Sequence, residues 1–585
     1  MSKQAVSVRY ESDGQEQRVD NPHFLLSDHG SSIFLGARTN DSSWSGISFL
    51  SLQDFKVTKT IHAFTPEVIP TRLEVADTCV TRSSESFQET FFMHDQLACY
   101  YTQGSSEVAV EVDVRLVDDY AVEGREHEAT LLSTNPTVVR FSNSKGSFLL
   151  VSTASVTLEN QWVKRATPYD NKRSGRPSWW VQRRAVIHAR EGTRTVICPE
   201  RRRIEAQHVL RTAHLWKRSQ HAQGDAALVH AKSSLEGLLT KTPTGEASVL
   251  AGLPWFFQIY TRDEAIAVGG LLAQGKYYLA SRILLREIAI ILSDGLIPNR
   301  FPHSETGSAD GVGWAFLRLR EVFWRSRDTL RDEQWLFVRR QLVSSLTRLR
   351  EQRVREGFVY NESQETWMDT TGGTSDTRSG ARIEIQALTL NMIRFCAELY
   401  EYMQEDSSVY RDWEEELCSQ VRAQFYNSQK HLLADGLGDW RVRPNVFIAY
   451  YAYDSLLSNA AWKEVFSNVV ERLFLSWGAF ASIDPSDELF CSEHLGEDDR
   501  SYHRGDAWYF LSNLAAVCLL RVSDDFLPVA RSVYAAARRD LLWAGACGHC
   551  SEISGAARQD AFGCWSQTWS ASTFIELAAS LAHHR

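Results

Sequence analysis

Residues 507–520 read AWYFLSNLAAVCLL, a run that contains no charged side chain. A surface helix keeps one polar face, whereas a helix with neighbours on all sides is apolar all round. We therefore expect this stretch to be an inner helix of a helical assembly. Residues 570–581 are likewise rich in apolar and small residues, while residues 331–350 are charged along one side, as a solvent-facing helix should be.

The helical period extends outward from this stretch over the second half of the chain. Apolar residues recur at spacings of three and four between breaks at Gly, Pro, Asn and Asp, which predicts about twelve helices. They are expected near residues 225–240, 262–274, 276–293, 310–323, 331–354, 380–404, 407–427, 445–455, 458–475, 503–520, 525–543 and 566–582. With the even-numbered stretches inside and the odd-numbered ones outside, they form an (α/α)6 toroid.

The chain before about residue 202 follows a different period. Alternating or short apolar runs, such as residues 32–35 and 108–114, are separated by Gly, Asn, Asp and Ser clusters. Many short strands without intervening helices are typical of an antiparallel β-sandwich. We predict an N-terminal β-sandwich domain over residues 1–202, a helical linker over residues 203–224 and an (α/α)6 catalytic domain over residues 225–585.

Composition excludes several classes of protein. Hydrophobic residues make up 43% and charged residues 23%, close to the average of globular proteins. The net charge of -10 gives no general attraction to nucleic acid or to an anionic membrane surface. The N-terminus has no apolar signal segment, and no run approaches the roughly 18 apolar residues of a membrane span. We expect a cytoplasmic protein without nucleic-acid or membrane partners.

The ten cysteines are scattered without the spacing of a small disulfide scaffold. Reduced and mostly buried thiols are therefore expected. Cys547 and Cys550 are closely spaced, but no second pair completes a metal site and no strand–helix context indicates a redox dithiol. We expect no metal ion and no cofactor.

Polar and aromatic residues gather in the connections that lead from an odd-numbered stretch to the next even-numbered one. The six clusters are Pro254-Trp255-Phe256 with Arg262-Asp263, Pro298-Asn299-Arg300 with Asp310, Glu365-Thr366-Trp367-Met368-Asp369, Arg443-Pro444-Asn445, Tyr502-His503-Arg504-Gly505, and Ser551-Glu552 with Gln567-Thr568-Trp569. These connections share one end of the toroid. Because loops on a rigid scaffold commonly carry binding and catalysis, that end is the candidate site.

The residue types in these loops indicate a neutral, hydroxyl-rich ligand. Aromatic side chains stack on sugar faces, carboxylates and guanidinium groups bind hydroxyls, and no Gly-rich phosphate loop is present. Glycoside hydrolysis needs two carboxyl groups flanking the bond. Asp369 follows Trp367 and Met368, and an apolar environment there would raise its pKa, as a general acid requires. Glu552, in the last loop, is the candidate base.

These loops resemble the amylo-α-1,6-glucosidase domain of glycogen debranching enzymes. The resemblance covers residues 251–310, 359–388 and 551–578. It is carried by Ala251-Gly252-Leu253-Pro254-Trp255-Phe256 with Arg262-Asp263, Asp294-Gly295-Leu296-Ile297-Pro298-Asn299-Arg300-Phe301-Pro302, Thr366-Trp367-Met368-Asp369, Arg382-Ile383-Glu384-Ile385-Gln386-Ala387-Leu388, and the three remaining clusters above. The helical domain of that family is similar to that of glucoamylases, and a β-sandwich typically precedes it.

The resemblance implies roles for individual residues. Asp369 is the implied general acid and Glu552 the implied general base of a reaction that inverts the anomeric configuration. The resemblance also implies a set of residues that bind the substrate or line its pocket. It comprises Arg262, Asp263 and Glu384 as glucose ligands, Trp255, Trp367 and His503 as pocket lining, and Asp310 and Trp569 as further substrate-binding residues.

The sequence departs from the family pattern at three places. Tyr260-Thr261 replaces a common Trp-Gly, Thr306-Gly307 replaces a common Tyr-Asn, and the loop after Asp369 is rich in Thr and Ser and contains Arg378. We expect each departure to change contacts that determine substrate specificity. The chain also has no room for the separate glucanotransferase barrel of bifunctional eukaryotic enzymes, so transferase activity is not implied.

The expected activity is that of an inverting, exo-acting glycoside hydrolase acting on an α-glucan or oligosaccharide. Release of glucose from α-1,6 branch points of glycogen-like glucans is the leading hypothesis. One alternative keeps the scaffold but changes the substrate to trehalose or a glucosyl conjugate. The other is a non-catalytic glucan-binding or scaffold protein.

Overall fold

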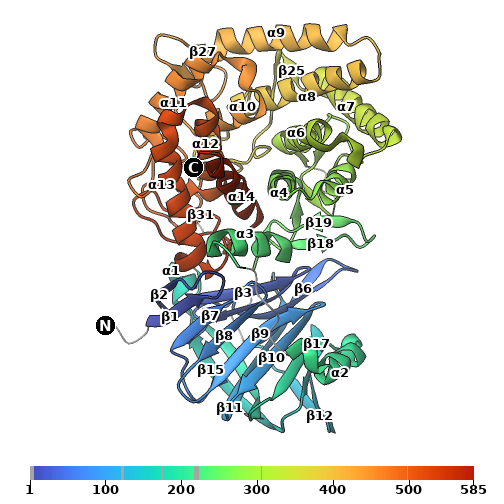
Figure 1. Cartoon of the computed structure of the whole chain (residues 1–585), viewed down its shortest axis with the longest axis vertical. Helices are drawn as coiled ribbons and strands as arrows, with labels where there is room; N and C mark the ends of the chain where they lie inside the picture. The colour runs from blue at the N-terminus through green and yellow to red at the C-terminus, as the bar shows by residue number, and fades with distance from the viewer. Residues whose placement is uncertain are drawn as a thin grey trace.

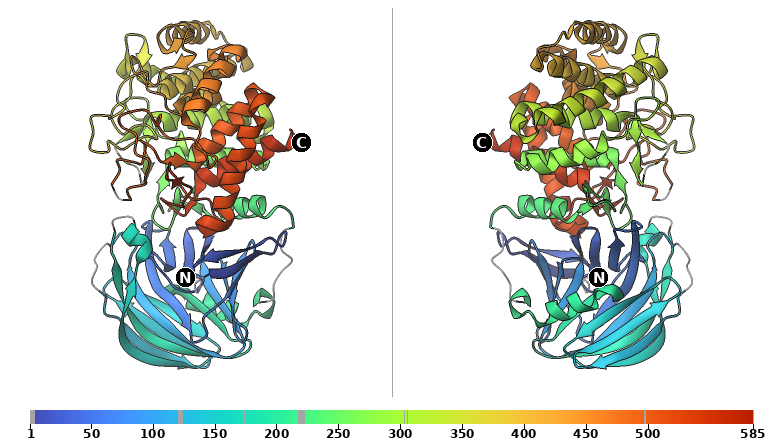
Figure 2. Two further views of the ribbon diagram at one scale, coloured as in Figure 1. Left: turned by 90° about the vertical axis from the view of Figure 1, so that its left-hand side faces the viewer. Right: turned by 90° about the vertical axis from the view of Figure 1, so that its right-hand side faces the viewer.

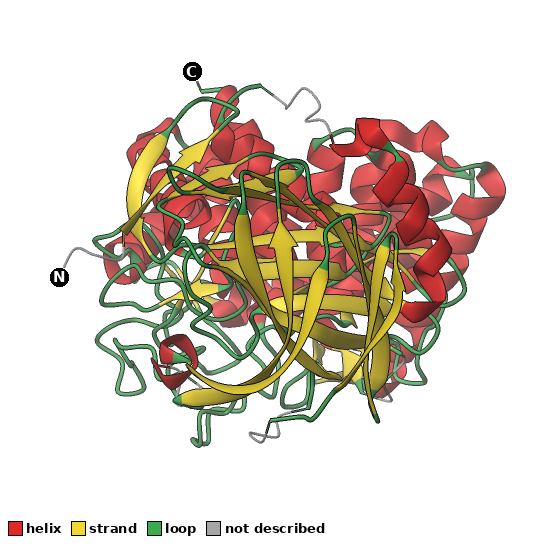
Figure 3. Ribbon diagram, turned by 90° about the horizontal axis from the view of Figure 1, so that it is seen from below, coloured by secondary structure: helices red, strands yellow, loops and turns green. Residues whose placement is uncertain are grey.

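The computed structural model describes residues 5–119, 124–172, 175–216, 223–302, 304, 306–496 and 498–584. A β-rich body formed by the N-terminal part is stacked end to end with a helical body formed by the rest (Figure 1). The two side views show the same stacking along the long axis (Figure 2). From the β end, the strands lie in front of the helices (Figure 3).

The β-rich body consists of two packed sheets. The ten-stranded sheet has the order β12 (Glu128–Thr134), β13 (Thr137–Asn143), β14 (Gly146–Ser152), β17 (Arg194–Pro199), β10 (Leu97–Gln103), β9 (Gln88–His94), β8 (Cys79–Ser83), β7 (Arg72–Val75), β1 (Ala5–Tyr10) and β2 (Glu16–Asp20). The eight-stranded sheet has the order β15 (Val156–Ala166), β16 (Ser178–Ala189), β11 (Ser106–Leu116), β6 (Lys56–Pro66), β5 (Gly46–Ser51), β4 (Ser31–Gly36), β3 (His23–Asp28) and β30 (Ala546–Cys547). The predicted sandwich is confirmed.

Alternation along the strands supplies the sandwich core. Val108, Val110, Val112 and Val114 of β11 are all fully buried, because every second residue of a strand points to the same face. Among the described strands of the two sheets, neighbours are antiparallel with two exceptions: β1 runs parallel to β7, and β3 runs parallel to β30. The second exception brings a strand from the C-terminal part of the chain into the sandwich.

Residues 203–224, predicted as a helical linker, begin with α2 (Arg203–Arg211) and a 3-10 turn over Ala213–Trp216. Val209, Leu210 and Trp216 pack with Leu149 and Cys198 of the ten-stranded sheet in a separate small core. This stretch therefore covers the outside of the sandwich. Residues 217–222 lie outside the described residues.

The helical body is a ring of paired helices. The inner helices are α4 (Thr261–Ala273), α6 (Ala309–Ser326), α8 (Ile383–Tyr402), α10 (Asn445–Ala452), α12 (Tyr509–Val522) and α14 (Thr568–Ala582), and each packs against the next until α14 closes the ring on α4. The outer helices are α3 (Ala226–Gly237), α5 (Tyr277–Glu287), α7 (Asp332–Gln352), α9 (Ser408–Phe425), α11 (Asn459–Leu473) and α13 (Leu527–Arg539). The (α/α)6 toroid and its inner set agree with the prediction.

Burial explains why the two sets of helices read differently in the sequence. Every residue of α12 except Arg521 is buried, as expected for a helix with neighbours on all sides. On α7, by contrast, burial follows a stripe that includes Trp335, Val338 and Leu342. The outer helices thus need only one apolar stripe, and their exposed sides carry the charge.

Cysteines and membrane segments can be compared with the prediction. All ten cysteines are free thiols, and all but the partly exposed Cys491 are buried. Cys547 and Cys550 are both buried, and His549 between them contacts the carbonyl oxygen of Leu25 in the sandwich through Nε2, at 2.9 Å. Among the described helices, none combines the length and the apolar character that crossing a bilayer requires.

Candidate active site

Short strand pairs join the loops at one end of the toroid. The first loop is joined to the last by β20 (Gly252–Leu253) pairing with β32 (Ser566–Gln567). Likewise β29 (Ala507–Trp508) pairs with β31 (Ile553–Ser554), directly after Glu552. The loops therefore support one another, which gives their side chains fixed positions on a rigid scaffold.

Arg262, in the first turn of α4, is buried at the centre of the site. Its Nε donates to both carboxylate oxygens of Asp310, at 2.7 and 2.8 Å, and its Nη1 lies 3.6 Å from Oδ2 of Asp369. Asp310 also accepts a hydrogen bond from the backbone N–H of Trp367, at 2.7 Å. Asp310 is 1% exposed, so it orients Arg262 and the Trp367–Asp369 segment from behind.

Asp369 lies in a different environment from the one predicted. Its side chain is 43% exposed and lies beside Arg262, and Oδ1 is 3.4 Å from Nε2 of the buried His503. The neighbouring Trp367 and Met368 are buried, and the Trp367 indole donates to Oδ1 of Asn445, at 2.6 Å. The two apolar neighbours pack into the core, whereas the Asp369 carboxylate faces solvent, the Arg262 guanidinium and the His503 ring. The expected apolar surroundings are therefore absent.

Glu552 is held on both of its carboxylate oxygens. The Tyr502 hydroxyl donates to Oε1, and the backbone N–H of Cys564 donates to Oε2, at 2.7 Å. The residue is 2% exposed yet lines the large cavity described below. An ionised carboxylate accepts hydrogen bonds at both oxygens, so this geometry suits a base that takes a proton from water.

Tyr502→Phe is expected to lower kcat about tenfold, because it removes the side-chain donor to Glu552. A hydrogen bond to a charged group contributes about 1.5–3 kcal/mol. The acidic limb of the kcat/KM pH profile should move to higher pH, since the lost bond stabilised the ionised form. Tyr278→Phe, at a 68% exposed position on α5, is the matched control. An unshifted pH profile in Tyr502→Phe would contradict this role.

Asp263 is a third carboxyl group in the same cluster. Burial raises the pKa of Asp263 to about 8, with the nearby negative charges of Glu552 and Asp369 adding to the effect and Arg262 opposing it. Its Oδ1 accepts a hydrogen bond from Nε2 of Gln567, at 3.0 Å. The raised pKa favours the protonated form of Asp263, which can donate a hydrogen bond.

Glu384 and Trp569 lie deeper than the resemblance suggests. Glu384, in the first turn of α8, is fully buried and accepts a hydrogen bond from Nη1 of Arg378, at 2.7 Å. Nη2 of Arg378 also donates to Oδ1 of Asp435, at 3.0 Å. Trp569 is 4% exposed and stacks on Phe510 with ring centroids 4.3 Å apart. Both residues support the site from behind, and a direct contact of either with glucose stays a prediction.

A cavity of about 640 Å³ opens at this face, between the toroid and the sandwich. The toroid contributes Trp255, Tyr260, Thr370, Tyr502 and Glu552 to its lining. Tyr260, one of the departures from the family pattern, therefore lies in the cavity wall. The volume lies within the roughly 300–1,000 Å³ of typical ligand sites.

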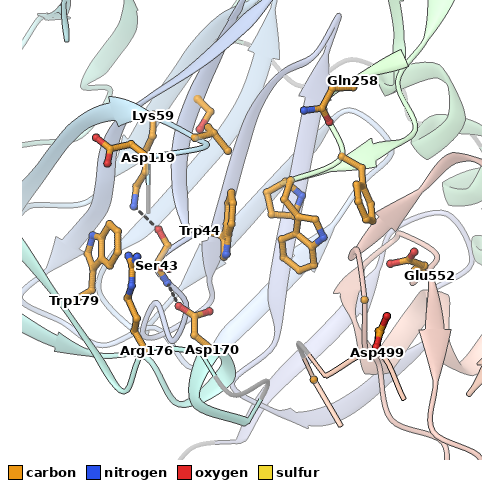
Figure 4. Close-up of a pocket in the computed structure, with 18 of the residues that line it drawn as sticks. Ser43, Trp44, Lys59, Asp119, Asp170, Arg176, Trp179, Gln258, Asp499 and Glu552 are labelled. Atoms are coloured by element: carbon orange, nitrogen blue, oxygen red, sulfur yellow. Dashed lines mark hydrogen bonds between the residues drawn. The ribbon is translucent and has the colours of Figure 1, made fainter. Parts of the chain in front are cut away.

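The sandwich forms the opposite wall of the cavity. Trp44, Lys59, Asp170, Arg176 and Trp179 all line it, and Figure 4 shows them facing Glu552 across the space. Reasoning from the sequence missed this wall completely. Trp44 stands alone among Ser and Asp residues, and such an aromatic in a polar loop was the available signal.

The predicted site residues divide into two groups. Arg262, Asp263, Asp369, His503 and Glu552 converge around one point of the face, and Trp255 lines the cavity beside them. Asp310, Trp367, Glu384 and Trp569 lie behind this group. Among the residues that the structure describes, no three His, Cys, Asp or Glu side chains are grouped to hold a metal ion.

Solved structures share the fold. A bacterial glucoamylase complexed with acarbose is 10% identical, with 97% of this chain and 89% of that chain covered and a TM-score of 0.58. The GH63 mannosylglycerate hydrolase from Thermus thermophilus, in complex with Tris, is 14% identical, with 60% and 99% covered and a TM-score of 0.46. The glucoamylase likeness establishes the architecture of a sandwich followed by a toroid. A comparison with curated proteins finds no match.

The family profile named amylo-alpha-1,6-glucosidase matches residues 232–576. This match spans more than half of the chain and includes all six loops of the site. The chain therefore belongs to the amylo-α-1,6-glucosidase family of glycoside hydrolases.

Proposed function

We propose that the protein is an inverting, exo-acting glycoside hydrolase that releases glucose from α-1,6-linked branches of an α-glucan. The observation that carries the proposal is the placement of two carboxyl groups at one face with different environments. Asp369 is exposed beside Arg262, whereas Glu552 is buried and held by two donors at the cavity wall. Two such groups are what glycoside hydrolysis requires.

In the proposed reaction Glu552 takes a proton from a water molecule. The water oxygen forms a bond to the anomeric carbon while the bond to the leaving oxygen breaks. Asp369, as the general acid, donates a proton to that oxygen. Water attacks from the side opposite the leaving group, so the configuration inverts, and inverting enzymes keep their carboxyl groups roughly 6.5–9.5 Å apart.

The surrounding residues have supporting roles in this proposal. Arg262 is fixed by Asp310 and can bind a glucose hydroxyl or orient Asp369. Protonated Asp263 can donate to a second hydroxyl. His503 stacks on Trp508 with centroids 4.9 Å apart and planes 6° from parallel, which fixes the ring beside Asp369. The terminal glucose would thus be bound through several hydrogen bonds before the bond is cleaved.

Proton NMR of the first anomer released from panose tests activity, substrate and stereochemistry together. We expect β-glucose to appear first and to convert to the equilibrium mixture afterwards. Glu552→Gln, which should release glucose at least ~100-fold more slowly, serves as the control. α-Glucose as the first product would overturn the inverting mechanism. Glucose released from trehalose but not from panose, isomaltose or limit dextrin would overturn the proposal that the substrate is α-1,6-linked.

A further inference from the structure

We propose that the sandwich domain binds the part of the substrate beyond the cleaved glucose, and that Trp44 is the stacking platform that makes the enzyme prefer an oligosaccharide leaving group. This inference rests on the proposed function. Its starting point is the cavity, whose lining comes in nearly equal parts from the sandwich and from the toroid. A leaving group that extends from a glucose near Glu552 into this cavity must therefore meet the sandwich wall.

Trp44 is carried on a loop that is fixed from two sides. Asp170 accepts hydrogen bonds from the Ser42 hydroxyl, at 2.6 Å, and from the Ser43 backbone N–H, at 2.8 Å. On the other side, the Nζ of the buried Lys59 donates to the carbonyl oxygen of Ser43, at 2.6 Å. The loop thus holds Trp44 in place before any ligand arrives, which lowers the entropy cost of binding.

Trp44 also meets an aromatic residue of the toroid. Its ring centroid lies 5.4 Å from that of Trp255, with the planes tilted by 54°. Figure 4 shows Trp44 between Glu552 on one side and Trp179 and Lys59 on the other. Trp residues offer flat apolar faces with a polar edge, and such faces suit pyranose rings. The position is that of a sugar subsite one or more units from the cleavage point.

The charges of the sandwich wall favour a neutral ligand. Lys59 lies 3.2 Å from Asp113, and Arg115 lies 2.7 Å from the same carboxylate. The Arg176 guanidinium lies 5.1 Å from the centre of the Trp179 ring. Carboxylates line the same space, so the cations of the wall are balanced rather than collected for an anion. Hydroxyl groups can use both signs of charge as hydrogen-bond partners.

The size of the cavity agrees with a ligand longer than one sugar. Its volume of about 640 Å³ lies in the middle of the range for drug-sized ligands, roughly 300–1,000 Å³. A single glucose would leave the sandwich wall without contacts. Trp179 is 3% exposed, so Trp44 is the aromatic side chain of this wall that can meet a sugar face, and a di- or trisaccharide is long enough to reach it.

The test compares a leaving group that can reach Trp44 with one that cannot. Panose carries a disaccharide leaving group, whereas α-glucosyl fluoride loses only fluoride. Trp44→Ala should lower kcat/KM for panose about 5- to 10-fold, the size of effect expected for loss of one aromatic stacking partner. The same variant should leave kcat/KM for α-glucosyl fluoride unchanged. Trp44→Phe should retain most of the activity on panose, because it keeps an aromatic face.

Trp180→Ala is the matched control. Trp180 is 39% exposed and follows the cavity-lining Trp179 on β16, so its side chain points to the opposite side of the sheet. Trp180→Ala should leave kcat/KM unchanged for both panose and α-glucosyl fluoride. If Trp44→Ala lowered kcat/KM equally for both substrates, or for neither, the proposed subsite at Trp44 would be wrong.

Calorimetry of panose binding separates this inference from the proposed function. In the Glu552→Gln background, addition of Trp44→Ala should raise the Kd for panose about 5- to 10-fold. An unchanged Kd would overturn the subsite even if hydrolysis is confirmed. If the unmodified protein cleaves neither panose nor α-glucosyl fluoride, the proposed function fails, and the binding experiment still decides whether the sandwich wall holds an oligosaccharide.

Discussion

Replacement of Asp369 by Asn, or of Glu552 by Gln, is expected to lower kcat on panose about 100- to 10,000-fold. General acid or base catalysis by a positioned carboxyl group contributes an effect of this size. Both replacements preserve the shape of the side chain but remove its ability to exchange a proton. Because Asp369 is exposed and Glu552→Gln keeps an acceptor for Tyr502, the fold should be unaffected. Initial rates of glucose release and far-UV circular dichroism measure the two effects.

α-Glucosyl fluoride distinguishes the two roles. Fluoride leaves with little help from an acid, so Asp369→Asn should recover much of its activity on this substrate. Glu552→Gln should not, because the attacking water still needs a base. If both variants kept the activity of the unmodified protein on panose, neither carboxyl group would be catalytic. Glucan binding in a protein without any hydrolysis would favour the non-catalytic alternative.

Arg378→Met is expected to destabilise the protein by about 3–5 kcal/mol. Arg378 is 2% exposed and bonds to Glu384 and Asp435. Its removal leaves the buried Glu384 without its cationic partner, whereas Asp435 keeps Arg382 and Arg443. Breaking a buried ion pair from one side carries a cost of this size. The midpoint of urea unfolding and the melting temperature measure the loss. Activity should fall as well, because Arg378 fixes the loop that follows Asp369.

Arg355→Met is the matched control for this prediction. Arg355 pairs with Glu362 at 3.7 Å, and both side chains are 61% exposed, so the pair contributes about 0–1 kcal/mol. The two variants differ in burial while the chemical change is the same. Equal stability of Arg378→Met and Arg355→Met would show that the buried network does not hold the loop.

The helices could be predicted because inner helices are buried on all sides, whereas outer helices are buried along one stripe. Their apolar residues therefore follow different patterns. The stretch expected near residues 503–520 is α12, Tyr509–Val522, and the alternate assignment of inner helices is correct. Helix ends were less accurate. The stretch expected over residues 276–293 ends at Glu287, although the residues that follow are apolar. The carbonyl oxygens of Ile288 and Ala289 accept hydrogen bonds from the Gln341 side chain of α7, and Ile290 is 38% exposed. An apolar run by itself therefore does not show where a helix ends.

The site was predictable only as far as its signals lie within the helical half. Arg262, Asp369 and Glu552 belong to recognisable sequence clusters, and the structure places Arg262 3.6 Å from Asp369. Their catalytic and binding roles stay predictions. Trp44 and Lys59 were not foreseen, because they come from loops and strands of the sandwich that have no local sign of contact with the toroid. The contact between the sandwich and the toroid depends on the surfaces of the two folded domains. Neither the strand period nor the helical period of the sequence contains information about such a contact.

The pairing of β30 with β3 links the order of synthesis to the completion of the fold. β3 leaves the ribosome early, yet its outer neighbour, Ala546–Cys547, follows more than 500 residues later. Until then the eight-stranded sheet has an open edge whose backbone groups can pair with other nascent chains. A chain interrupted before residue 546 keeps that edge permanently. Completion of this sheet edge therefore depends on translation of the segment that leads into the loop carrying Glu552.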